Sequence, residues 1–150
     1  MTLPTRLAIV SLAAVPLVAL GQAAAAATTA GRPITVTMTG AAERPGPGDP
    51  DGAGTAELRI NAGQRQVCYK LTVSHLDTVT GAHIHRAPPT AAGPVVVGLM
   101  APTSGASSGC ASVTRALAQQ IIRNPGAFYV NVHTSAHPSG AIRAQLSRTP

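Results

Sequence analysis

Most of the chain consists of short segments in which apolar and polar residues alternate. The first places Ile34, Val36 and Met38 on one face, with threonines between them on the other. Alternation at every second position predicts a β-strand with one buried and one exposed face. Further strand-like segments lie at 55–60, 67–73, 83–86, 94–99, 127–134 and 140–146. We therefore expect seven or eight short strands.

One segment has the spacing of a helix. Leu117 with Ile121, and Ala118 with Ile122, form an apolar stripe, and Thr114 can cap the first turn. An Asn-Pro-Gly sequence at 124–126 ends it. Loops rich in Pro, Gly, Ser or Asp are expected at 40–54, 103–109 and 135–139. This pattern predicts an all-β fold, an immunoglobulin-like or Greek-key antiparallel β-sandwich with one short helix.

Two of the predicted strands carry histidines on one face. His83 and His85 stand two positions apart, so both project from the same side of their strand. The later segment places Tyr129, Asn131 and His133 together on its polar face. If these strands are neighbours, three imidazoles converge and could bind copper or zinc, with Tyr129 or Asn131 orienting a ring. The alternative is that the histidines only donate hydrogen bonds to loop carbonyls beneath the proline-rich segment.

Two other polar residues lie near this face. His137, in the loop at 135–139, is close enough in sequence to serve as a fourth ligand, or it is an ordinary turn residue before a proline. Arg143 projects with Ala141 and Gln145 from the polar face of the last strand. From that pattern alone we expect it to be solvated or paired with an acid such as Asp77.

The first 27 residues have the features of an export signal. Arg6 is followed by an apolar run at 7–20 and by small residues at 23–27. We expect cleavage near Ala27, which leaves one domain at 28–150 and a secreted or extracytoplasmic protein with no membrane span. In an exported chain, Cys68 and Cys110 most simply form a disulfide, whereas a metal or redox pair would favour a closer spacing.

The composition excludes several classes of function. Removing the signal lowers the net charge from +6 to +5, and the arginines are scattered rather than clustered. With only 2% aromatic residues there is no platform for bases, so nucleic-acid binding is not expected. The five acidic residues form no clear catalytic pair, and no serine lies in a nucleophile elbow.

Several motifs, in order along the chain, resemble the CHRD (chordin) domain. They are Cys-Tyr-Lys-Leu-Thr-Val at 68–73, Gly-Ala-His-Ile-His at 81–85, Gly-Pro-Val-Val-Val at 93–97, Ser-Gly-Cys at 108–110, Tyr-Val-Asn-Val-His-Thr at 129–134 and Pro-Ser-Gly-Ala-Ile-Arg at 138–143. The resemblance covers roughly residues 34–146. It implies an immunoglobulin-like β-sandwich in a secreted protein.

A more distant likeness is to copper/zinc superoxide dismutase, in which a His-x-His strand and a later Val-x-Val-His strand supply three copper ligands. This likeness implies copper at His83, His85 and His133, and an anion-binding role for Arg143. No histidine lies between His85 and His133, so the bridging ligand and zinc loop of that family are missing.

Together these features predict a secreted CHRD binding module that holds copper or zinc. Its partner would be an extracellular protein or a cell-wall polymer. The alternatives are a superoxide dismutase-like copper enzyme and a purely structural cell-surface protein.

Overall fold

The computed structural model describes residues 31–148. Its strands are β1 (Arg32–Thr39), β2 (Ala53–Asn61), β3 (Gln66–Ser74), β4 (Val79–Arg86), β5 (Val95–Leu99), β6 (Ala106–Ser112), β7 (Phe128–Thr134) and β8 (Ile142–Gln145). The helical elements are α2 (Arg115–Arg123) and two single 3-10 turns, η1 (Gly40–Ala42) and η2 (Pro125–Ala127). The predicted export signal at 1–27 lies outside the described residues. Within 31–148, no helix has the length and apolar character needed to cross a bilayer.

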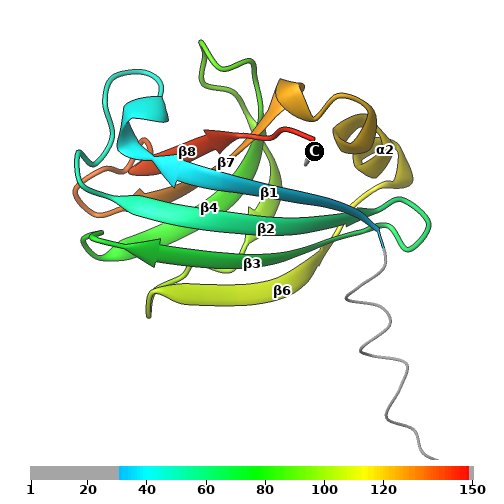
Figure 1. The fold of residues 1–150 in the computed structure, drawn as a ribbon, viewed down its shortest axis with the longest axis horizontal. Helices are drawn as coiled ribbons and strands as arrows, with labels where there is room; N and C mark the ends of the chain where they lie inside the picture. The colour runs from blue at the N-terminus through cyan, green and yellow to red at the C-terminus, as the bar shows by residue number, and fades with distance from the viewer. Residues whose placement is uncertain (1–30, 149–150) are drawn as a thin grey trace, which may run out of the picture.

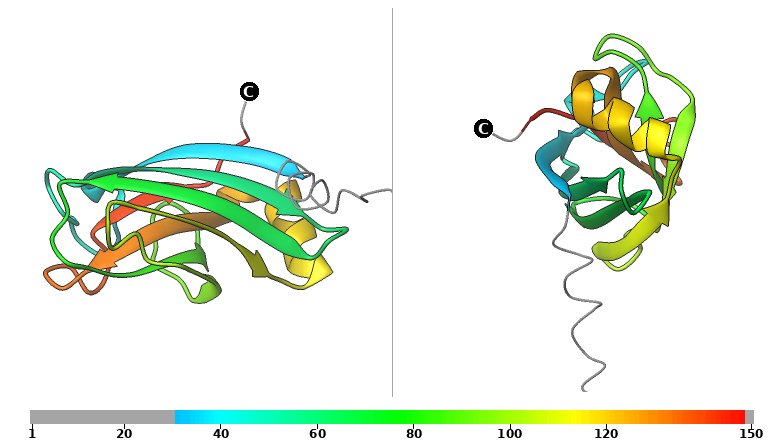
Figure 2. Two further views of the ribbon diagram at one scale, coloured as in Figure 1. Left: turned by 90° about the horizontal axis from the view of Figure 1, so that it is seen from below. Right: turned by 90° about the vertical axis from the view of Figure 1, so that its right-hand side faces the viewer.

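All eight strands belong to one sheet with the order β5-β4-β7-β8-β1-β2-β3-β6. Each neighbouring pair is antiparallel. The sheet curls so that β1, β2, β3 and β6 lie opposite β8, β7, β4 and β5 (Figures 1 and 2). A single residue pair, Thr39 with Arg143, joins β1 to β8, so the two halves are only loosely connected there. The all-β prediction is confirmed, and the nearly closed sheet shares features of a sandwich and a barrel.

Aliphatic side chains fill the space enclosed by the sheet. The alternation in β1 buries Ile34, Val36 and Met38, and β7 buries Val130 and Val132 in the same core. Fully burying such a side chain contributes about 1.5–3 kcal/mol. Because one face of each strand packs in this core, its polar residues lie on the opposite face.

The predicted helix is confirmed and covers one end of the core (Figure 1). Thr114 is its N-cap, because the Thr114 hydroxyl oxygen accepts a hydrogen bond of 3.1 Å from the amide of Leu117. Ala118 and Ile121 are buried against the sheet. The helix ends at Arg123, directly before the Asn-Pro-Gly sequence.

The loop predicted at 103–109 is wrong over its second half, because Ala106–Ser112 forms β6 and pairs with β3. The lack of a side chain at Gly109 leaves room for a side chain of the neighbouring strand. A Cβ at Gly109 would lie only 2.9 Å from the hydroxyl oxygen of Tyr69 on β3. Strand pairing therefore outweighs the loop-like composition of this segment.

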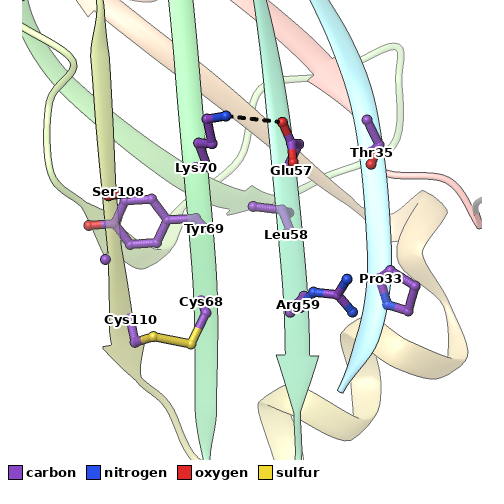
Figure 3. Close-up of a pocket in the computed structure, with 11 residues that line it drawn as sticks. Pro33, Thr35, Glu57, Leu58, Arg59, Cys68, Tyr69, Lys70, Ser108 and Cys110 are labelled. Carbon is purple, nitrogen blue, oxygen red and sulfur yellow. Dashed lines mark ion pairs between the residues drawn. A yellow bond between two sulfur atoms is a disulfide. The ribbon is translucent and has the colours of Figure 1, made fainter. Parts of the chain in front are cut away.

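The disulfide between Cys68 and Cys110 is confirmed. The two cysteines are directly opposite each other in the β3–β6 register, so the bridge joins neighbouring strands. Figure 3 shows it at the edge of a pocket over β1, β2, β3 and β6, where Lys70 pairs with Glu57. This half of the sheet does not carry the histidines.

Candidate metal centre

The strands β4 and β7, which carry the histidines, are neighbours in the sheet (Figure 1). The antiparallel register places Gly81 opposite His133, and His85 opposite Tyr129. Residues on one face of an antiparallel pair lie within reach of their direct and diagonal neighbours. The prediction that the two histidine strands adjoin is therefore confirmed.

The imidazoles of His83, His85 and His133 meet on the polar face of these strands. One possible ligand atom from each of the three lies within 4.8 Å of the others. The ring centroids of His83 and His133 are 5.0 Å apart, and those of His83 and His85 are 5.6 Å apart. Among residues 31–148, this is the one group of three or more His, Cys, Asp or Glu side chains with such spacing.

Loop carbonyls fix the orientation of two rings. The Nδ1 of His85 lies 2.8 Å from the carbonyl oxygen of Gly93, and the Nδ1 of His133 lies 3.0 Å from that of Pro138. A carbonyl can only accept, so each Nδ1 carries the hydrogen and each Nε2 carries a lone pair. This is the arrangement by which protein groups orient metal-binding histidines.

One nitrogen in each of the three rings is buried and has no hydrogen-bond partner within residues 31–148. They are the Nε2 atoms of His85 and His133 and the Nδ1 of His83. A buried acceptor left without a partner costs about 1–3 kcal/mol, so native structures rarely keep several together. A metal ion bound by these nitrogens would satisfy all three. The residues therefore fit copper or zinc, both of which accept imidazole nitrogen.

Burial favours the neutral form of two of these imidazoles, His83 and His133. It lowers the pKa of His83, and the neighbouring charges of His133 and His85 lower it further. Burial also lowers the pKa of His133, which the bond to the Pro138 carbonyl partly opposes. Because metal binding requires the unprotonated ring, lowered pKa values prepare the site for a metal near neutral pH.

Tyr129 contacts both His85 and the loop that orients it. Its ring stacks on that of His85, with the centroids 4.7 Å apart and 9° between the planes. Its hydroxyl oxygen accepts a hydrogen bond of 3.2 Å from the amide of Gly93. The structure thus brings Tyr129 to the site, where it supports His85 through its ring face and through the loop at 87–94.

Asn131 lies on the same strand as Tyr129, two positions further along. It lies between His83 on β4 and Arg143 on β8 in the register, and it is 1% exposed. Its side chain is hydrogen-bonded to Glu43. Asn131 therefore connects the histidine face to a buried acid. The partner of its side chain is this acid and not an imidazole.

The expectation of a solvated Arg143 is wrong, because this residue is only 1% exposed. Its guanidinium donates to the carbonyl oxygens of Ala91 and Pro88, at 2.9 and 3.0 Å. The guanidinium carbon lies 3.4 Å from the centroid of Tyr129. Asp77 accepts instead from the hydroxyl of Ser135. The proline-rich loop covers this face, so the contacts of Arg143 give no support to the anion-binding role.

Sequence reasoning missed Glu43, which is 3% exposed. Burial raises its pKa to about 7, although a backbone bond at Arg44, the charge of Arg143 and the bond to Asn131 oppose the rise. A lone acid between an alanine and an arginine carries no signal of such burial. The position depends on how the loop at 43–50 packs against Gly140 and Ala141, directly before β8.

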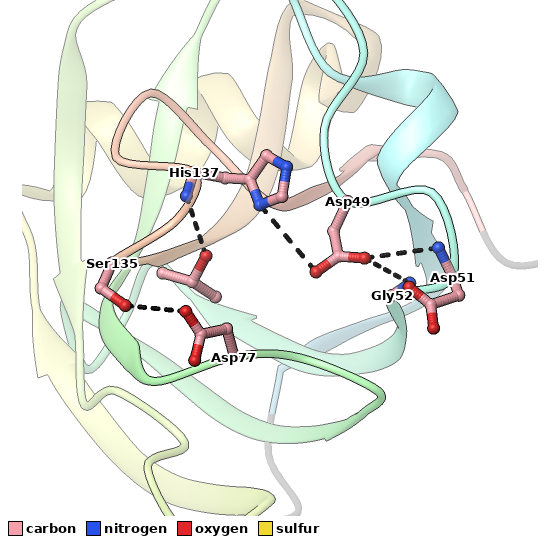
Figure 4. Close-up of polar contacts among 7 residues, drawn as sticks. Asp49, Asp51, Gly52, Asp77, Ser135 and His137 are labelled. Atoms are coloured by element: carbon pink, nitrogen blue, oxygen red, sulfur yellow. Dashed lines mark hydrogen bonds and ion pairs between the residues drawn. The ribbon is translucent and has the colours of Figure 1, made fainter.

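The structure does not bring His137 into the cluster. Figure 4 shows its Nδ1 directed to Asp49, with the carboxylate oxygen 3.9 Å away. The amide of His137 donates to the hydroxyl of Thr134, and Asp49 accepts from the amides of Asp51 and Gly52. Both residues thus have the contacts of turn residues.

A β-rich domain with one cross-strand disulfide and three converging imidazoles defines the class of this protein. The chain belongs to the CHRD family, because the model of the CHRD domain matches residues 34–146. CHRD domains are extracellular binding modules, and the disulfide is in keeping with an oxidising compartment. No curated protein and no solved structure matches the chain. The likeness to superoxide dismutase thus finds no support in these comparisons.

Proposed function

We propose that this CHRD domain is a secreted binding module that holds copper or zinc through His83, His85 and His133. The observation that carries the proposal is the convergence of three buried ring nitrogens, each without a partner among the described residues. Two of them have their second nitrogen fixed by a loop carbonyl. A purely structural role would leave these three ring nitrogens without a partner among the described residues.

Three protein ligands would leave the metal with a coordination position for a further donor. A bound metal would there supply a Lewis-acidic centre. The protein part of this role is to hold three neutral imidazoles in a fixed orientation and to limit access of water with the loop at 87–94. The external donor would come from an extracellular protein or a cell-wall polymer, through a carboxylate or an imidazole.

Metal titration of the mature domain, residues 28–150, tests the proposal. We expect one equivalent of copper or zinc to bind, and the variants His83→Ala and His133→Ala each to weaken binding by at least about tenfold. His137→Ala is the matched control, because His137 precedes Pro138, whose carbonyl contacts His133, but lies outside the cluster. If the wild-type domain binds neither metal, or if His83→Ala binds as tightly as wild type, the proposal is wrong.

A further inference from the structure

The candidate ligand set carries no negative charge. It consists of three imidazoles, with no carboxylate or thiolate in the group. The hydrogen bonds from His85 and His133 go to neutral carbonyls, so the partners of these rings also add no negative charge. Any metal ion bound here would keep its full positive charge within the protein.

A buried cation, the guanidinium of Arg143, contacts the tyrosine that stacks on His85. The guanidinium of Arg143 packs on one ring face of Tyr129, at 3.4 Å, and the same tyrosine stacks on His85, at 4.7 Å. Arg143 is 1% exposed, so water screens its charge poorly. Its two terminal nitrogens donate to neutral oxygens of Ala91, Pro88 and Gln145, which leave the charge in place.

One acid offsets this charge in part. Glu43, 3% exposed, interacts electrostatically with Arg143 and is linked to the histidine face by Asn131. Arg143 and Glu43 therefore act on the metal site with opposite signs, while neither is a candidate ligand. Substituting Arg143 makes the charge near the site less positive, and substituting Glu43 makes it more positive.

We infer that the site takes copper as the monovalent ion in preference to divalent copper or zinc. The inference rests on the proposed function. A divalent ion is repelled about twice as strongly by the Arg143 charge as a monovalent one, and none of the three protein ligands carries a negative charge to offset the difference. Three neutral nitrogens also suffice for monovalent copper, whereas divalent copper favours a tetragonal set with more donors.

The test compares monovalent copper with Zn²⁺ in the same protein. The dissociation constant of each is measured anaerobically at pH 8 by competition with a chromophoric chelator, bicinchoninate for copper. The ratio of the two constants is the readout. Effects on folding or on protonation of the three histidines act on both metals alike and largely cancel in this ratio. For the wild type we expect monovalent copper to bind more tightly.

Variants of Arg143 and Glu43 should change the ratio of the two dissociation constants in opposite directions. Arg143→Met removes the cation and should reduce the preference for copper roughly tenfold, while Arg143→Lys keeps the charge and should reduce it much less. At pH 8 the Glu43 carboxyl, with a pKa of about 7, is mainly ionised. Glu43→Gln should therefore raise the preference, roughly threefold. If the Arg143 variants do not fold, the direction of the Glu43→Gln shift decides.

The outcomes separate the two proposals. Tighter binding of Zn²⁺ than of monovalent copper overturns the inference and leaves the metal-binding function standing. Equal ratios for Arg143→Met and Arg143→Lys, or a fall with Glu43→Gln, also overturn it. Binding of neither metal by the wild type overturns the proposed function itself.

Discussion

The Tyr129 ring lies parallel to the imidazole of His85, with 9° between the planes and 4.7 Å between the centroids. The two residues are directly opposite each other in the register of β4 and β7. The amide of Gly93 donates to the Tyr129 hydroxyl, and the Gly93 carbonyl accepts from His85. One residue of the loop thus holds both rings, and the orientation of His85 depends on the tyrosine as well as on its own hydrogen bond.

Replacing Tyr129 tests this dependence. In Tyr129→Leu the stacked ring and the bond to Gly93 are both lost, so His85 is held less firmly. We expect copper or zinc affinity to fall by about tenfold, as is typical when groups that orient metal-binding histidines are removed. Isothermal titration calorimetry measures the change.

Tyr129→Phe is the matched control. It keeps the stacked ring and removes only the hydroxyl, so affinity should change less than in Tyr129→Leu, while the unpaired amide of Gly93 lowers stability by about 1 kcal/mol. Equal affinity in Tyr129→Leu and wild type would show that the stack does not position His85.

Gly140 is expected to be intolerant of any side chain. Its φ is +140°, and a Cβ there would lie 2.4 Å from the Oε1 of buried Glu43. Gly140→Ala should therefore lower stability by about 2 kcal/mol or more, through backbone strain and displacement of the acid. Gly98→Ala is the control, since no atom of residues 31–148 lies within 4 Å of its Cβ position. Urea unfolding of the two variants should differ clearly, and a similar small loss in both would contradict this account.

The alternating pattern of the sequence predicts most of the strands and the meeting of His83, His85 and His133, and the separate helical spacing at 117–122 predicts the helix. The reason is that period-two alternation specifies which side chains share a face. Once β4 and β7 pair, that face is common to both strands. The sequence pattern does not specify what covers the polar face.

That limit explains the errors at Arg143 and β6. Arg143 has the alternation of an exposed residue, but the proline-rich loop folds over it and supplies two carbonyl acceptors. The Ser- and Gly-rich composition of 106–109 is typical of a loop, yet the edge of β3 provides backbone partners for it. Both outcomes depend on contacts between segments distant in sequence, which local composition does not encode.

Removing the disulfide should destabilise the domain without affecting the metal site. Cys68 and Cys110 are 42 residues apart, and closing a loop of that length contributes about 4 kcal/mol in the chain-entropy account, of which less is usually realised. We expect the double variant Cys68→Ala/Cys110→Ala to lose about 2–4 kcal/mol in urea unfolding. Because β3 and β6 lie in the other half of the sheet, metal affinity should stay within about twofold of wild type. A large loss of affinity in the folded variant would show coupling between the halves.

Glu43 should give the domain a stability that falls as the pH rises. Burial raises its pKa from the ordinary value of 4.5 to about 7, so the folded protein binds this proton more tightly than the unfolded chain does. The contribution is therefore fully present below pH 4.5 and is lost as the pH rises through 7. A difference of this size corresponds to about 3 kcal/mol.

The measurement is urea unfolding of wild type and Glu43→Gln at pH 5 and pH 8. The lowered pKa values of His83 and His133 act in the opposite direction, because their contribution is lost as the pH falls. Since both proteins carry these histidines, the difference between them isolates Glu43. Glu43→Gln should gain stability relative to wild type between pH 5 and pH 8, by about 2–3 kcal/mol. Parallel pH dependence in the two proteins would mean that Glu43 titrates near its ordinary value in the folded state.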